Sequence, residues 1–133
     1  MAKSLEIAEY YELVALHKAL HVPRFSRDPM IPWLSGSPYL ADIANRIVNT
    51  LAIMEAERGK PERAKNWQMR IDPNGEVWRI AVNNAAVDSD IWNSQTHQQK
   101  VDLARIFLSP FTFTDEMIEL FIDQVNDQAN TTF

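Results

Sequence analysis

The sequence predicts an α+β fold in which about four helices pack around one β-hairpin, in the order α-α-β-β-α-α. Three observations lead to this prediction. Apolar residues recur at helical spacing in several segments, and an Asn-Gly pair separates two runs of alternating apolar residues. The chain has 133 residues, 46% of them hydrophobic, which is the size and composition of a single globular domain, 1–133.

The first predicted helix covers residues 4–22, with Ser4 as its N-cap. Pro23 is expected to end it, because proline lacks the amide hydrogen and disfavours helix in the residue before it. Apolar residues fall on two sides of this helix, which indicates neighbours on both sides. One side carries Leu5, Leu13, Leu16 and Leu20, and the other carries Ile7, Tyr11, Val14 and Val22.

Residues 23–38, which hold four of the seven prolines, are expected to form a proline-rich loop. The loop also carries large apolar side chains, among them Phe25 and Trp33, which are unusual in a solvated linker. The loop therefore either folds back over the core or presents these side chains to a partner. Since an exposed tryptophan near arginines is typical of interface hot spots, Trp33 and Phe25 are candidate partner-binding residues.

The clearest helix is expected over residues 38–58. Ser37 is its N-cap, and Pro38 occupies the first helical position, where a missing amide hydrogen costs nothing. Gly59, followed by Lys-Pro, is a stop signal. An apolar stripe at helical spacing runs through Leu40, Ile43, Ala44, Ile47, Val48, Leu51 and Met54.

The hairpin is predicted over residues 67–82, with its turn at Asn74-Gly75. Two registers compete. A type I turn with Gly75 as a bulge would mix polar and apolar side chains on one face. A type I′ turn gives one apolar face, which burial favours. That register pairs Ile71 with Trp78, Met69 with Ile80 and Trp67 with Val82.

Two further helices are expected, over residues 94–108 and 115–128. Thr114 caps the second of them, and Ser109-Pro110 ends the first. Residues 129–133 are expected to be a frayed tail.

The charge of the chain is unevenly distributed. The net charge is −5, but residues 1–66 hold nine basic and eight acidic residues, whereas residues 67–133 hold four and ten. Such a balance argues against nucleic acid and anionic membranes as partners, because both need Lys and Arg for binding. The chain has no cysteine and no apolar run long enough to cross a bilayer, so a cytoplasmic location is expected.

No motif for catalysis or cofactor binding is present, so the protein is expected to be non-catalytic and without a cofactor. Each of the three glycines has a structural explanation, and none lies in a phosphate-binding loop. His17 and His21 lie four residues apart and could share one metal ion. They are weak candidates, because residue 18 is Lys where a metalloprotease needs Glu, and no third ligand is evident.

An acidic stripe is the strongest candidate site. Glu116, Glu119, Asp123 and Asp127 follow one another at spacings of three and four residues along the last helix. The segment holds no Lys or Arg to offset their repulsion, and the last two acids oppose the helix dipole. The stripe is either an ordinary solvated face or a surface for a cationic partner.

The leading functional hypothesis is a small acidic protein that binds a basic protein. Its physical type is that of an inhibitor, an immunity protein, an antitoxin or a phage- or plasmid-encoded modulator. One alternative is a structural homo-oligomer or assembly subunit that uses loop 23–38 and the first helix as its interface. A further alternative is a metal-dependent enzyme that uses His17 and His21.

Overall fold

The structure is a computed structural model that describes residues 4–27 and 34–131, and within these ranges it contains helices and no β-strand. The predicted α+β fold class is therefore wrong, and the described residues form an all-α fold. The helices are α1 Tyr10–Arg24, α2 Pro38–Glu57, α3 Pro61–Trp67, α4 Glu76–Ala86, α5 Ser89–Asn93, α6 His97–Leu108 and α7 Asp115–Ala129.

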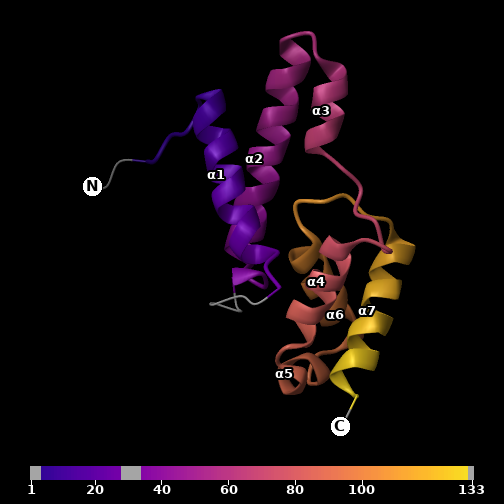
Figure 1. The fold of residues 1–133 in the computed structure, drawn as a ribbon. Coiled ribbons are helices and arrows are strands. Elements are labelled where there is room, and N and C mark those ends of the chain that lie inside the picture. The colour runs from indigo at the N-terminus through magenta and orange to yellow at the C-terminus, as the bar shows by residue number, and fades with distance from the viewer. Residues whose placement is uncertain (1–3, 28–33, 132–133) are drawn as a thin grey trace.

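The helices fall into two groups, which we call the arm (α1–α3) and the body (α4–α7). In Figure 1 the three helices of the arm run side by side above the body, and α7 forms one edge of the body. Each group has its own cluster of buried apolar residues. The cluster of the arm is built on Leu13, Ile47 and Leu51, and that of the body includes Trp78, Trp92, Leu108, Phe121 and Val125.

The predicted hairpin over residues 67–82 does not exist. Its first half is the end of α3 and a connecting segment, and its second half is α4. The segment makes a single isolated bridge between Arg70 and Thr112. The prediction failed because Trp78, Ile80 and Val82 alternate like strand residues. Four of the six buried residues of α4, at positions 78, 81, 82 and 85, have helical spacing.

The turn predicted at Asn74-Gly75 is nevertheless present, and it lies directly before α4. Asp72 accepts a hydrogen bond from the Asn74 amide at 2.9 Å, and the Gly75 amide bonds to the Asp72 carbonyl at 2.9 Å. This is an Asx-type turn, and Gly75 then serves as the N-cap of α4. The same residues that start a hairpin thus start a helix here.

Helix α2 was predicted closely. The Ser37 hydroxyl accepts a hydrogen bond from the Leu40 amide at 3.3 Å, and Pro38 is the first helical residue. Gly59 has a φ of 73°, the left-handed conformation that glycine adopts without strain. Cap, first turn and stop signal are therefore confirmed.

Helix α1 differs from its prediction at both ends. It begins at Tyr10, because the Glu9 carboxylate accepts hydrogen bonds from the amides of Tyr11 and Glu12. It continues through Pro23 to Arg24 instead of ending before the proline. A proline in the last turn removes only one helical hydrogen bond, and the next turn closes from the Phe25 amide to the His21 carbonyl.

The last two predicted helices are confirmed with small shifts. Helix α6 begins at His97 with a capping box formed by Thr96 and Gln99, and α7 is capped by Thr114 as predicted. The short helix α5, which contains the buried Trp92, was not predicted.

Arg24 joins the arm to the body. Its side chain is 1% exposed, and its guanidinium donates hydrogen bonds to the carbonyls of Ile106 at 2.8 Å and Ser109 at 2.9 Å. These carbonyls lie at the C-terminal end of α6, where a positive charge is favourable. In return, the Asn84 side chain donates to the Arg24 carbonyl at 3.1 Å. One residue of α1 is thereby tied to both α4 and α6.

Candidate functional site

The local sequence fixes how α7 is placed in the body. The Thr114 hydroxyl accepts a hydrogen bond from the Met117 amide at 3.2 Å and starts the helix. The inner face of α7 is fully packed, because it carries four apolar residues with at most 2% exposure. These residues are Ile118, Phe121, Ile122 and Val125.

Two tryptophans set the rotation of α7 about its axis. The Trp78 indole N–H donates to the Gln124 side-chain oxygen at 2.8 Å, and the Trp92 indole N–H donates to that of Asn126 at 2.8 Å. Both indoles are buried, so each hydrogen bond satisfies a donor that has left water. With residues 124 and 126 held on the inner side, the acidic side chains face outward.

We call the residues Glu116, Glu119, Asp123 and Asp127 the acidic face. All four are exposed. Glu119 lies 3.0 Å from the Nε2 atom of His97, a pairing that is ionic only when the histidine is protonated. Within residues 4–27 and 34–131, the carboxylates of Glu116, Asp123 and Asp127 have no ion pair and no hydrogen bond.

Few cations lie beside the acidic face. Lys100 donates to the Asn126 side chain at 2.8 Å and lies 5.4 Å from the centre of the Trp92 ring. Arg79 lines a groove of about 540 Å³ together with Asp127, but the two do not form an ion pair. At the start of α7, Arg105 lies 3.9 Å from Asp115, outside the acidic face. The acidic face is therefore left largely uncompensated.

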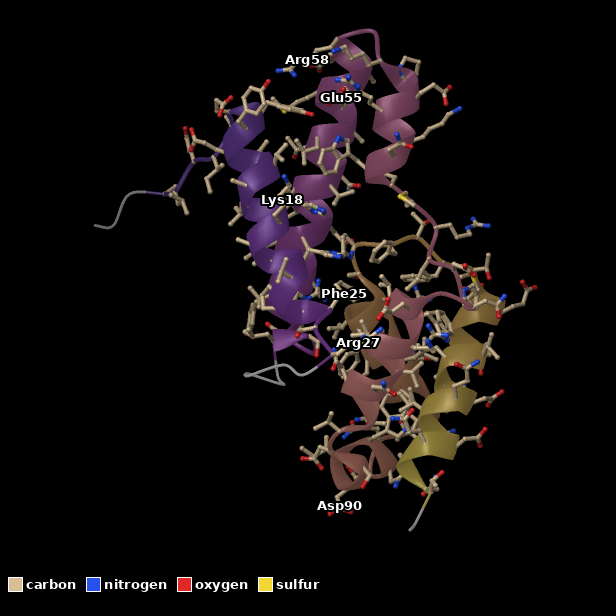
Figure 2. The ribbon with its side chains drawn as sticks, in the orientation of Figure 1. Lys18, Phe25, Arg27, Glu55, Arg58 and Asp90 are labelled. Carbon is tan, nitrogen blue, oxygen red and sulfur yellow. The ribbon has the colours of Figure 1, made fainter. Side chains whose placement is uncertain are left out.

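The other two partner-binding candidates do not join this face. Phe25 is 8% exposed and belongs to the body core, where its ring packs edge-on against Phe111 at 5.5 Å. In Figure 2 it lies where the arm meets the body. A side chain buried in this way is part of the fold, so we do not retain Phe25 as a partner-binding residue. Trp33 lies outside the described residues.

The two histidines of the first helix are packed among aromatic rings. Their own rings stack at 5.7 Å, His17 packs against Trp67 at 5.3 Å, and His21 packs against Phe25 at 4.8 Å. Burial lowers the pKa of both imidazoles. No group of three potential metal ligands occurs among the described residues, so packing accounts for the histidine pair.

Besides Arg24, a second charged group is buried that the sequence pattern did not predict. Glu55 on α2 is 1% exposed, near the tip of the arm in Figure 2. A side-chain hydrogen-bond interaction with Glu55, and then burial, raise the pKa of Tyr10. Neither carboxylate oxygen of Glu55 has a hydrogen-bond partner of normal geometry among the described residues. The sequence pattern that could have indicated its burial is its position four residues after the buried Leu51, on the same face of α2.

None of the described helices is both long enough and apolar enough to cross a membrane. Comparison with known proteins gives no match to any protein-family model, curated protein or solved structure.

Proposed function

We propose that this chain is a small, non-catalytic acidic protein of the cytoplasm that binds a basic protein through the acidic face of α7. The observation that carries the proposal is the set of three exposed carboxylates, Glu116, Asp123 and Asp127, that have no partner in the described part of the chain. They lie on a helix whose opposite side is fully buried, so the face is held rigidly in water.

The acidic face opposes the stability of its own helix. Asp127 lies in the last turn of α7, where the helix dipole disfavours negative charge, and Asp123 repels neighbours four residues away on both sides. Charges that only kept the protein soluble could lie anywhere on the surface. Their concentration at this unfavourable place supports a role in recognition.

Electrostatic steering is the mechanism that such a face supports. A rigid row of like charges attracts an oppositely charged surface over distances of about one Debye length, roughly 8 Å at physiological salt. Steering of this kind raises association rates by about 10- to 1,000-fold and weakens steeply as salt is added. Nucleic acids and anionic membranes would be repelled, so a basic protein is the fitting partner.

The test compares two variants of equal net charge. The face variant carries Glu116→Gln, Glu119→Gln, Asp123→Asn and Asp127→Asn. The control variant neutralises four exposed acids of the first part of the chain, Glu6→Gln, Glu12→Gln, Glu57→Gln and Glu62→Gln. Wild type and both variants are used to capture partners from native cell extract, and association rates of the captured protein are measured against salt concentration.

The proposal expects the face variant to associate at least about tenfold more slowly at low salt, with a flatter salt dependence. The control variant is expected to stay close to wild type. Equal slowing of both variants would show that net charge alone matters, and unchanged rates in the face variant would contradict the proposal.

A second candidate function is self-association through the arm. Six large apolar residues on the arm and the segment before it are exposed: Leu5, Tyr11, Val22, Tyr39, Ile43 and Ile53. An apolar groove of about 420 Å³ lies between α1 and α2, lined by Leu16, Leu20 and Ile43 among others. Sedimentation velocity over a range of concentrations tests this candidate, with Val22→Glu as the disrupting variant. A monomer at every concentration contradicts it.

A further inference from the structure

The body has an open pocket away from the acidic face. It is an apolar pocket of about 500 Å³ where the end of α4, helix α5 and helix α6 meet the turn before α2. A pocket of this size lies within the range of natural ligand sites. Its lining consists of Gly36, Asn84, Ala85, Val87, Asp88, Ile91, Trp92, Leu103 and Phe107.

The pocket has one rigid wall and an exposed apolar rim. Trp92 is 2% exposed and is held by its hydrogen bond to Asn126, so it forms a rigid wall. Val87 and Ile91 are 61% and 59% exposed and form the apolar rim of the pocket. On the opposite side, a Cβ atom at Gly36 would lie only 3.1 Å from the Phe107 ring. Because Gly36 has no side chain, the Phe107 ring can lie close to it and line the pocket.

The charged residue in the described lining of the pocket is acidic, and the nearby Lys100 ammonium, 5.4 Å from the centre of the Trp92 ring, is held by the Asn126 side chain. Asp88 is the charged member of the lining, and one of its oxygens caps α5 by accepting from the Ile91 amide at 3.1 Å. Asp90 is exposed on the same short helix, at the foot of the body in Figure 2, and the exposed Asp102 precedes Leu103 in α6. Among the residues that the structure describes, no Lys or Arg lines the pocket.

We propose that this pocket binds the apolar side of a basic amphipathic helix from a partner protein. Aliphatic side chains one helical turn apart would enter between Ile91 and Phe107, and the Lys or Arg residues beside them would face Asp88 and Asp90. The negative rim excludes anionic lipid surfaces and acidic helices as occupants. Their negative charges would lie beside those of Asp88 and Asp90, and both would lose contact with water. The acidic rim thus favours a basic helix as the occupant.

This site is separate from the acidic face. No residue of α7 lines the pocket, so the inference does not depend on the function proposed above. Loss of binding at one site and retention at the other can therefore be told apart by experiment.

The probe is a synthetic amphipathic peptide of Leu and Lys, about 18 residues or five helical turns long. A second peptide with Glu in place of Lys is its control. Binding is measured by isothermal titration calorimetry, together with the fluorescence change of the tryptophans. Circular dichroism confirms that each protein variant stays helical.

The test variant is Ile91→Ser and its matched control is Ile53→Ser on α2, because both isoleucines are 59% exposed. Because Ile91 is 59% exposed, the peptide can bury only about three-fifths of its surface, so Ile91→Ser is expected to weaken Lys-peptide binding by roughly five- to twentyfold. Ile53→Ser is expected to change it by less than about twofold. Asp88→Asn keeps the α5 cap and is expected to weaken binding and flatten its salt dependence.

Three outcomes would overturn the inference. Equal effects of Ile91→Ser and Ile53→Ser would place the peptide elsewhere. Binding of the Glu peptide as tightly as the Lys peptide would remove the charge argument. Binding that the α7 face variant abolishes and Ile91→Ser leaves unchanged would belong to the acidic face, which would reject the pocket while supporting the other proposal.

Discussion

The acidic face makes a prediction about stability that needs no partner. Asp127→Asn removes a negative charge from the last turn of α7, where the helix dipole disfavours it. The substitution also removes one repulsion with Asp123, four residues earlier. Asparagine and aspartate have similar helix propensities, so the change isolates the charge. Unlike most substitutions, this one is expected to stabilise the protein.

The size of the effect follows from those two contributions. The dipole contributes about 0.3–1 kcal/mol and the repulsion about 0.2–0.5 kcal/mol, so the free energy of unfolding should rise by about 0.5–1.5 kcal/mol. Asp115→Asn is the matched control at the other end of α7. There the negative charge is favourable and lies 3.9 Å from Arg105, so its removal should lower the free energy of unfolding.

Urea unfolding followed by circular dichroism measures both changes. With a slope of about 1–3 kcal/mol per molar urea, the midpoint of Asp127→Asn should rise by a few tenths of a molar. Both effects should shrink at about 1 M salt, where the Debye length is about 3 Å. If the two substitutions shift the midpoint in the same direction, net charge and not position controls stability, and the reasoning about α7 is refuted.

Three further predictions concern the fold. Arg24→Met should lower the free energy of unfolding by about 2–4 kcal/mol, because it leaves buried carbonyls of α6 without their charged donor. Urea unfolding measures this change, and a loss below about 0.5 kcal/mol would contradict the prediction. Gly59→Ala should lower the free energy of unfolding by about 1–2 kcal/mol, since a φ of 73° is strained for any residue with a side chain. Thermal or urea unfolding measures this change, and an unchanged midpoint would contradict the prediction. Burial lowers the pKa of His17 and His21, so the unfolded chain binds more protons near pH 6 and the free energy of unfolding should fall as pH drops below about 6.5. Urea midpoints from pH 7.5 to 5 measure this, and a His17→Phe/His21→Phe variant with an undiminished pH dependence would contradict the assignment.

Sequence reasoning succeeded where local signals agreed with one another. In α2, the cap at Ser37, the proline at position 38 and the stop at Gly59 frame one continuous apolar stripe. In α7, the cap at Thr114 and the helical spacing of the apolar residues gave the helix and its outward acidic side. In both helices the same residues determine the local conformation and the packing.

The hairpin prediction failed because an ambiguous pattern was read with the wrong period. Trp78, Ile80 and Val82 fit a strand, but Ala81 and Ala85 complete a helical stripe that small residues made easy to overlook. The turn at Asn74-Gly75 is compatible with both structures. Which of them forms is decided by packing against α6 and α7, and this lies outside any local window.

The connections between distant segments were also beyond the sequence. Arg24 falls in the predicted loop 23–38, yet it is the last residue of α1, is buried, and bonds to carbonyls more than 80 residues away. The apolar pocket is likewise assembled from four separate segments. No inhibitor or immunity-protein assignment follows from the structure or the comparisons, and we do not carry those types forward.

The association rate of the captured basic partner with wild type and with the α7 face variant, measured across a salt series, tests the central claim most directly. Association should be fast and salt-sensitive for wild type, and slow and nearly independent of salt for the face variant. Equal rates and equal salt slopes for the two proteins would contradict it.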